Sequence, residues 1–363
     1  MELLSVTMND GVRPRSEIEG KDNSSEDKSN YKVVLTGDMV YNSMRMWQGA
    51  NGISPCDGIV SPAYTVLMPK IPISNGYFAA FFKSPNLINE FRKNSQGMTS
   101  DTWNLKYPQI ETIKVCIPAL SEQNRVADML GTLERRIAKQ VQLVDSLKKY
   151  KRGVFEMVFS QKVRLIPKSK RKDWQNYKLS DFTTRVTRKN GGQSDIPLTI
   201  SAQYGLIDQR DFFSKTIASA DMSGYYLLRS GEYAYNRSTS NDYPFGSIKR
   251  LELYPMGAVS TLYLCFRVKD DIVLRDLAKW YFESSQWHRG VNEICAEGAR
   301  NHGLLNVPTD GFFNTVHTLP SDPEEQLAIA SYLSLFQARL DSAQAVLEKL
   351  LRIRSGLMQR LFI

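Results

Sequence analysis

An internal repeat constrains this sequence more than any other feature. Residues 121–127, which include the pair Glu122-Gln123, are matched by residues 324–330, which include Glu325-Gln326, at an offset of 203. The same offset carries Gly153 to Gly356 and continues without a gap to residues 159 and 362. A constant offset over about 40 residues is difficult to obtain by chance and decides the architecture of a chain. The sequence therefore contains two copies of one long segment.

The regions that precede these segments also match, but more loosely. Residues 37–42 align with 231–236 at an offset of 194, and residues 60–64 align with 259–263 at an offset of 199. Residues 107–108 align with 307–308 at 200. A growing offset indicates small insertions in the second copy, as loops permit. The order of the chain is therefore a variable unit, a long segment, a second variable unit and a second long segment.

The two variable units differ at their beginnings. In the second unit about two dozen residues, among them Trp174 and Leu179, precede residues 198–201. In the first unit only residues 1–3 precede the corresponding residues 4–7. We therefore expect the first unit to lack an opening segment. Supply of the segment by another chain, dispensability of the segment and a truncated reading frame all remain open.

The long segments have the apolar spacing of a coiled coil. Apolar residues advance by alternating steps of four and three, which average 3.5 and keep one seam facing a partner helix. Only Gln140, Lys151 and Arg354 interrupt the seam, and Lys151 and Arg354 are equivalent under the repeat. At ~1.5 Å per residue such helices reach ~60 Å, which favours a spacer over the alternative of two helices in an ordinary helical domain. The predicted seam consists of Leu133, Ile137, Val144, Leu147, Val154, Phe336, Leu340, Leu347, Leu350 and Leu357.

The variable units show the pattern of α/β domains. Short β-rich runs occur at residues 33–35, 64–67, 199–200, 225–228 and 262–266, and amphipathic helices are predicted over residues 75–94 and 273–295. Residues 22–28 are polar enough for a loop. The fold class is thus α+β, with two α/β domains separated by two long helices. The expected boundaries are 1–120 for the first domain, 121–161 for the first spacer helix, 162–320 for the second domain and 321–363 for the second spacer helix.

Composition indicates a polyanionic partner. The net charge is +9, and residues 161–320 carry 22 basic and 16 acidic side chains, whereas residues 1–120 carry 12 of each. A basic run at residues 168–172 is equally compatible with a solvated linker and with phosphate contacts. The sequence has no stretch of ~18 apolar residues and no basic-then-apolar leader at residue 1, so we expect a cytoplasmic protein. The four cysteines form no CxxC pair and are expected to be reduced and buried.

Catalytic motifs are not found in the sequence. No GxxxxGK[ST] stretch is present, and residues 241–245 have the letters of a methyltransferase tetrad in the wrong order. The three histidines, His288, His302 and His317, lie in unlike contexts without metal-ligand spacing. We therefore expect a chain that is not an enzyme and holds no cofactor or metal.

The residues that remain are those that can contact DNA. Bases are recognised by Arg, Lys, Asn, Gln, Ser and Thr on rigidly placed loops. Residues 41–48 and 235–241 concentrate such side chains at equivalent places, as do residues 96–100 and 297–302. The alternative is that Tyr41 and Tyr235 pack in cores while the polar residues cap turns. The candidate DNA contacts are Asn42, Arg45, Gln48, Thr99, Lys170, Arg171, Asn236, Arg237, Asn241, Lys249, Arg300 and Asn301.

These features resemble the specificity subunits of type I restriction–modification enzymes. The first unit resembles one recurring type of target-recognition domain, and the helix starts resemble the family's proline, Glu-Gln and alanine pattern. The resemblance covers nearly the whole chain. It is carried by Tyr41-Asn42, Arg45-Met46-Trp47-Gln48-Gly49, Gly58-Ile59-Val60-Ser61-Pro62-Ala63-Tyr64 and Trp103-Asn104-Leu105-Lys106-Tyr107-Pro108.

The resemblance implies an architecture and a set of partners. Each domain would recognise one half of a split target in double-stranded DNA, and the two helices would pack antiparallel. Methyltransferase subunits would bind this frame and modify adenine with S-adenosylmethionine, and restriction subunits would add translocation and cleavage driven by ATP with Mg²⁺. Two other classes of function remain: a coiled-coil scaffold that presents two protein-binding domains, and a fused modification enzyme.

Overall fold

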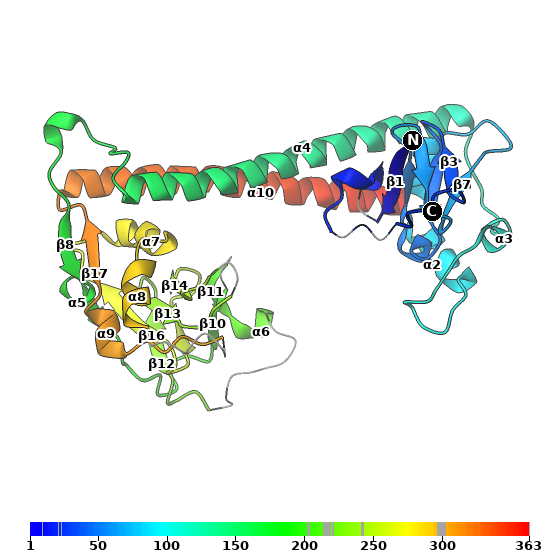
Figure 1. The fold of residues 1–363 in the computed structure, drawn as a ribbon. Helices are drawn as coiled ribbons and strands as arrows, with labels where there is room; N and C mark the ends of the chain where they lie inside the picture. Colours follow the sequence, from blue (N-terminus) through cyan, green and yellow to red (C-terminus); the bar gives the residue numbers. More distant parts are fainter. Residues whose placement is uncertain are drawn as a thin grey trace. The chain divides into compact units, whose positions relative to one another are not determined.

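The chain folds into two compact units (Figure 1). The computed structural model describes residues 1–8, 10–20, 22, 24–201, 204–212, 219, 221–240, 243–295 and 303–362. Unit 1 comprises Met1–Val144 and Ser342–Ile363, and unit 2 comprises Asp145–Asp341. Each unit contains an α/β domain together with one part of each of two long helices, α4 (Leu120–Phe159) and α10 (Pro323–Leu361).

The domain of unit 1 is built on two small sheets. Its strands are β1 (Glu2–Thr7), β2 (Gly11–Pro14), β3 (Lys32–Val34), β4 (Met39–Asn42), β5 (Asn51–Ile53), β6 (Gly58–Val60) and β7 (Tyr64–Leu67). One sheet has the order β2-β1-β6-β3, in which only the β1–β6 pair is parallel. The other sheet has the order β5-β4-β7 and is antiparallel. The strands expected at 33–35 and 64–67 are β3 and β7.

Three short helices complete this domain: α1 (Asn75–Phe81), α2 (Pro85–Asn94) and α3 (Tyr107–Ile110). The prediction of one helix over residues 75–94 was wrong, because a new helix begins in the middle. The Ser84 hydroxyl accepts a hydrogen bond from the Leu87 backbone N–H (3.4 Å), and Pro85 stands at the first helical position. Proline is well suited to that position because its missing N–H would have no helical partner there.

The domain of unit 2 has more strands. They are β8 (Gln175–Lys178), β9 (Thr183–Arg185), β10 (Leu198–Ser201), β11 (Gly205–Asp208), β12 (Tyr226–Arg229), β13 (Tyr233–Asn236), β14 (Ser247–Arg250), β15 (Met256–Val259), β16 (Leu264–Val268) and β17 (Val316–Leu319). The largest sheet has the order β14-β13-β16-β9, and β10-β11, β12-β15 and β17-β8 form two-stranded ribbons. Strand β10 contains the β-rich run expected at 199–200, and β12 and β16 overlap the runs expected at 225–228 and 262–266.

The helices of unit 2 are α5 (Leu179–Phe182), α6 (Gln209–Phe212), α7 (Arg275–Glu283), α8 (His288–Ile294) and α9 (Thr309–Phe313). The prediction of one helix over residues 273–295 was wrong. Ser284 is extended (φ −85°, ψ 173°), and its hydroxyl donates to the Tyr281 carbonyl (2.6 Å) and accepts from the Gln286 N–H (3.3 Å). A serine that bonds the backbone on both sides ends one helix and prepares the next.

The two domains share one strand register. Leu4 lies opposite Pro14 in β1–β2, and Leu198 lies opposite Asp208 in β10–β11, so both residues of the pair move by 194. The sheet β5-β4-β7 corresponds to β14-β13-β16. The difference is that β8 and β9 have no counterpart among the described residues of unit 1.

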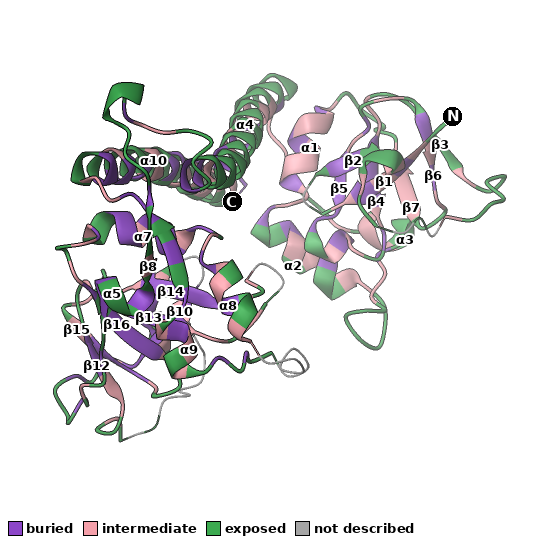
Figure 2. Ribbon diagram, turned by 60° about the vertical axis from the view of Figure 1, so that its left-hand side comes forward, coloured by how far each residue is buried: buried purple, intermediate pink, exposed green. Residues whose placement is uncertain are grey.

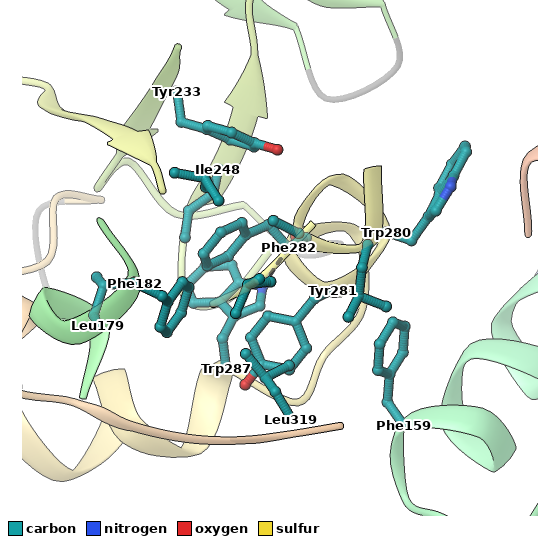
Figure 3. Packing of buried hydrophobic residues seen from close by; sticks show 14 of the residues in the cluster. Phe159, Leu179, Phe182, Tyr233, Ile248, Trp280, Tyr281, Phe282, Trp287 and Leu319 are labelled. Atoms are coloured by element: carbon teal, nitrogen blue, oxygen red, sulfur yellow. Dashed lines mark hydrogen bonds between the residues drawn. The ribbon is translucent and has the colours of Figure 1, made fainter. Parts of the chain in front are cut away.

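Each domain has a core that extends onto the long helices. In unit 2, Tyr281, Phe282 and Trp287 pack with Phe182 of α5, and Phe159 of α4 closes the cluster (Figure 3). The burial colouring shows β13 and β16 mostly buried, whereas α4 and α10 keep exposed faces (Figure 2). Tyr41 and Tyr235 are fully buried in the cores of their units, as the alternative to base contact predicted.

Candidate nucleic-acid interface

The loop after β4 presents two candidate residues of unit 1. The Asn42 side-chain oxygen accepts a hydrogen bond from the Met44 N–H (3.0 Å), so this amide shapes the turn. A single 3₁₀ turn, Met46–Gln48, follows and is closed by Gly49 at φ 85°. Arg45 is half-exposed and Gln48 is exposed. Within the described part of the chain, the Arg45 guanidinium has no side-chain hydrogen-bond or ion-pair partner, so it is available for a ligand.

A second loop joins the first at the same edge of unit 1. The Leu105 N–H donates to the Ser43 carbonyl (2.8 Å) and ties residues 96–104 to the turn after β4. The rings of Trp47 and Trp103, one from each loop, meet edge to face at 5.0 Å. Thr99 lies in the exposed part of the second loop. The structure thus brings Arg45, Gln48 and Thr99 to one loop pair.

Sequence reasoning missed a cation at this loop pair. The Arg92 guanidinium lies over the Trp47 ring, 5.6 Å from its centroid, and Arg92 is exposed. When an arginine stacks on an indole ring, the ring fixes the plane of the guanidinium, and the N–H groups of the guanidinium remain available to donate hydrogen bonds. The signal was present in the sequence as a tryptophan in each candidate loop, but only the fold shows that α2 supplies the arginine.

In the described part of unit 2, the turn after β13 and the backbone bond that ties it to the following segment repeat those of unit 1, with a different use of the arginine. The Asn236 side-chain oxygen accepts from the Ser238 N–H (3.0 Å), as Asn42 does in unit 1. The Leu305 N–H donates to the Arg237 carbonyl (2.9 Å), which matches the Leu105–Ser43 bond. The Arg237 guanidinium, however, donates to the Leu262 carbonyl (3.0 Å) and the Val307 carbonyl (3.4 Å). Arg237 therefore holds the loops together. The candidates Asn241, Arg300 and Asn301 lie outside the described residues, as does His302.

Two of the lysines predicted to contact DNA, Lys249 and Lys170, form ion pairs within the chain. Lys249 is a correction: its side chain is 8% exposed and its ammonium binds the Glu283 carboxylate at 2.7 Å, so it cannot reach a phosphate without leaving the core. Lys170 binds the Glu324 carboxylate at 2.7 Å, and this interaction raises the pKa of the lysine.

The basic run at residues 168–172 therefore lies against the start of α10. Lys172 adds an ion pair with Asp322 (3.2 Å), and the Arg171 guanidinium donates to the Ile166 carbonyl (3.3 Å). Carboxylates gather at the first turn of a helix because its dipole favours negative charge there, and these carboxylates attract the lysines. The ammonium of Lys170 and the guanidinium of Arg171 are therefore engaged by groups of the chain itself.

The predicted seam falls on the buried side of the two long helices, and two of its residues, Val154 and Leu357, pack in the domain cores. Its ten positions are all buried or half-buried, whereas most of their helical neighbours are exposed. In unit 1 the Gln140 side chain donates to the Ala343 carbonyl (2.7 Å), and Arg354 lies 3.6 Å from Glu134. As residue numbers rise along α4 they fall along α10, so the paired segments are antiparallel.

Two polar residues that contact each other across the helices in unit 1 have equivalents that contact each other in unit 2. In unit 2 the Lys151 ammonium donates to the Gln337 amide oxygen (2.6 Å). Lys151 and Gln337 are the equivalents of Arg354 and Glu134 at the offset of 203. Burial lowers the pKa of Lys151, and the nearby Glu283 carboxylate opposes this effect. Polar residues in such a seam fix the register of the two helices at some cost in stability.

The Glu-Gln motif at each helix start has a structural role. The Gln123 amide oxygen accepts from the Ser74 N–H (3.0 Å), and its nitrogen donates to the Pro118 carbonyl (2.9 Å). The Gln326 amide oxygen accepts from the Leu274 N–H (2.8 Å), and its nitrogen donates to the Pro320 carbonyl (2.8 Å). Both glutamines are buried. Each one joins the start of a long helix to the start of a domain helix, α1 in unit 1 and α7 in unit 2.

The remaining titratable residues do not assemble a catalytic site in the described part of the chain. His317 is buried between the Tyr281 hydroxyl and the Thr315 hydroxyl, both at 2.8 Å, and burial lowers the pKa of His317 to about 4. No cluster of three potential metal ligands occurs among the described residues. Cys265 is buried, but Cys116 is exposed, so the expectation that all four cysteines are buried was wrong. None of the described helices is long and apolar enough to cross a bilayer.

Comparison with solved structures identifies the fold. The type I restriction-modification S subunit from M. genitalium aligns with 92% of this chain and 84% of its own, at a TM-score of 0.57 and 12% identity. A chain from a structure of the type I R-M system, solved for complex assembly and conformational transition, aligns over 91% and 83%, at 0.52 and 15%. The HsdS subunit from Thermoanaerobacter tengcongensis aligns over 98% and 88%, at 0.49 and 15%. No family model matches the chain. The first two likenesses show that the chain has the S-subunit fold.

Proposed function

We propose that this chain is the sequence-specific DNA-recognition subunit of a type I restriction–modification system and is not itself an enzyme. The observation that carries the proposal is the repeated loop pair, tied by the Leu105–Ser43 bond in unit 1 and the Leu305–Arg237 bond in unit 2, on the S-subunit fold. One loop pair on each of two units suits a split target in which each unit recognises one half.

The chemistry of the unit 1 loop pair supports base recognition. Arginine donates two parallel hydrogen bonds to guanine O6 and N7, and glutamine donates one hydrogen bond to adenine N7 and accepts one from adenine N6. Arg45 and Gln48 are three residues apart on a turn whose geometry is fixed by Asn42 and Gly49. A rigid support lowers the entropy lost on binding. Arg92 adds a positive charge that suits a phosphate or a base edge.

The partners follow from this proposal. Double-stranded DNA is the ligand, and methyltransferase subunits and restriction subunits are the protein partners. These partners use S-adenosylmethionine, ATP and Mg²⁺, so the present chain acts as their guide in adenine methylation and cleavage. A cytoplasmic location follows from the same function.

A double substitution in unit 1 tests the proposal. Arg45→Ala with Gln48→Ala should relax recognition of one half-site by about 5- to 150-fold per lost contact, because a direct base contact contributes about 1–3 kcal/mol of discrimination. The other half-site should still be recognised. Mapping of methylated adenines, with the chain in its methyltransferase complex, measures both halves at once.

The control is Arg352→Ala, which removes an exposed arginine of α10 whose carboxylate neighbour Glu348 is 3.9 Å away. It should leave both half-sites unchanged. Equal loss at both halves in the double variant would reject recognition by separate units. DNA binding by the complex should also weaken steeply with salt, whereas a protein-binding scaffold would show no DNA binding.

A further inference from the structure

Unit 2 contains an opening segment, residues 164–186, that binds the start of α10. The Arg164 guanidinium donates to the Glu325 carboxylate (2.6 Å for the Nη2 bond), and the Trp174 indole N–H donates to the same carboxylate (3.1 Å). Glu325 is fully buried by these contacts. Its equivalent in unit 1, Glu122, is exposed. The carboxylate is therefore repeated, but in the described chain its two partners are found only in unit 2.

The opening segment also pairs with a strand that is unpaired in unit 1. Strand β8 pairs with β17 along residues 316–319, and the Thr318 hydroxyl donates to the Asn176 side chain (2.7 Å). Counting back from Pro118 and Pro320, the equivalents of β17 are residues 114–117. Among the described residues, 114–117 make no backbone hydrogen bond. Val115 is 40% exposed, whereas its equivalent His317 is 3% exposed.

A second strand edge is open in unit 1, as the equivalent strands of unit 2 show. Strand β9 pairs with β16, and the Val186 N–H donates to the Cys265 carbonyl (2.8 Å). Cys265 corresponds to Val66 of β7, which is the edge strand of its sheet. The residues of β16 are buried except Arg267, whereas all residues of β7 are only half-buried. The backbone of Val66 therefore faces an unoccupied side among the described residues.

Pro69 does not block this edge. It corresponds to Val268, which lies opposite Thr183 between two hydrogen-bonded pairs, Cys265–Val186 and Lys269–Phe182. Hydrogen-bonded and non-bonded pairs alternate in an antiparallel ladder, so the N–H at this position is not needed by an added strand. The edge can accept a strand in the register of β9.

Between its two strands the opening segment inserts apolar side chains. Leu179 and Phe182 of α5 are fully buried and point into the core cluster (Figure 3). The Phe182 ring meets the His317 ring edge to face at 5.8 Å. The same side chains in unit 1 would cover Val115 and the half-buried face of β7.

We propose that unit 1 binds a segment of a separate polypeptide with the chemistry of residues 164–186. Its arginine and tryptophan bind Glu122, its first strand pairs with residues 114–117, its apolar turn covers Val115, and its second strand pairs with residues 66–68. Strand addition to an open edge supplies backbone hydrogen bonds, and the buried aromatic residues supply specificity. The site is independent of the DNA-recognition loops and of the function proposed for them.

The probe is a fluorescein-labelled peptide with the sequence of residues 162–187 of this chain, added to the full-length protein. We expect saturable binding measured by anisotropy, and slower hydrogen exchange at residues 66–68 and 114–117. Alkylation of Cys116, which takes the place of Thr318 beside the added strand, should slow as well, with Cys295 of unit 2 as the internal reference. A peptide with Trp174→Ala and Phe182→Ala should bind at least about tenfold more weakly.

A charge exchange locates the peptide. Glu122→Arg, a substitution at an exposed helical position, should weaken binding of the peptide by about tenfold. A peptide with Arg164→Glu should regain this affinity when it is added to the Glu122→Arg variant. Glu122→Gln should give an intermediate affinity.

Three outcomes overturn the proposal. One is no saturable binding, and another is protection confined to unit 2. The third is a chain that sediments as a dimer with residues 114–117 already protected, which would assign the site to a second copy.

Discussion

The cores of the two units include matching residues of the long helices, but in the described part of the chain only unit 2 has an opening segment that covers its domain. In unit 1 the core cluster reaches Leu130 and Phe362, and in unit 2 it reaches Leu333 and Phe159, each pair related by the offset of 203. The match extends to the other helix residues at these cores, Val126, Ala127, Leu357, Met358 and Leu361 in unit 1 and Ile329, Ala330, Val154, Phe155 and Val158 in unit 2.

The difference between the units shows which part of the repeat is constrained by packing. These residues of the long helices belong to the same core clusters as the domain side chains, and a close-packed core tolerates little change in side-chain volume. Glu122 and Glu325 show the opposite case, because the same side chain is exposed in one unit and buried by Arg164 and Trp174 in the other. An identical residue therefore contributes to stability only where its partners are present.

The largest expected effect breaks the seam in both units. Leu147 and Leu350 are equivalent and are 8% and 6% exposed. Leu147→Asp and Leu350→Asp should each cost at least ~4 kcal/mol, since truncation of a buried leucine costs ~2–5 kcal/mol and an unpaired buried charge adds to that. Urea unfolding followed by circular dichroism measures the loss. Leu335→Asp, at a position 72% exposed, is the control. Native stability in both seam variants would mean that the helices do not pack through these residues.

The next effect separates the units. Glu325→Ala should destabilise unit 2 by ~3–5 kcal/mol, because it leaves the Arg164 guanidinium buried without its counter-ion. Glu122→Ala should leave the unfolding curve unchanged, since the carboxylate is exposed. Denaturant titrations of the two variants under one buffer make the comparison. Equal destabilisation would show that Glu122 also has a buried partner.

The repeat and the spacing of apolar residues predicted most of the fold. The offset of 194 carries over to the paired strands, and the two long helices begin and end within three residues of the expected 121–161 and 321–363. The two amphipathic stretches were predicted as single helices because their apolar spacing continues through Ser84 and Ser284. A serine that bonds the backbone interrupts the helix without interrupting that spacing.

The candidate site was less predictable, because a charged side chain does not indicate its partner. Lys249 and Arg45 both lie next to polar turns in the sequence. In the structure, however, Lys249 is buried against Glu283 and Arg45 is half-exposed. The partner Glu283 is 34 residues away and comes from a helix. Arg92 could not be placed beside Trp47 for the same reason. Long-range pairing of this kind requires the fold.

A smaller effect depends on pH and should appear in unit 2 alone. His317 has a pKa lowered to about 4 by burial, below the usual 6.5, so the unfolded state takes up the proton first as pH falls. The associated stability is present above about pH 6.5 and is lost as pH falls toward 4, by up to about 3 kcal/mol. The equivalent residue in unit 1 is Val115, which does not titrate.

Urea unfolding at a series of pH values measures this effect. In a Trp47→Phe, Trp103→Phe background the remaining tryptophans all lie in unit 2, so their fluorescence reports on that unit. His317→Gln is the control that removes this imidazole and should reduce the pH dependence between 6.5 and 4; the remainder belongs to His288, whose pKa burial also lowers. An unchanged slope in this variant would assign the dependence to His288 and to carboxylates.

The smallest effect tests whether the two helix starts are energetically equivalent. Gln123→Ala and Gln326→Ala should each cost ~1–3 kcal/mol, because each leaves a backbone N–H and a proline carbonyl, one of them buried and the other part-buried, without their partner. Gln326 also donates to the Ile272 carbonyl (2.9 Å), so its loss should exceed that of Gln123 by a fraction of this amount. Hydrogen exchange at Ser74 and Leu274, whose N–H groups bond the two glutamines, measures each side separately. If Gln123→Ala released the Ser74 amide without lowering stability, the motif would stabilise the helix start of unit 2 alone. The glutamine would then be repeated in the sequence, but its contribution to the free energy of unfolding would not.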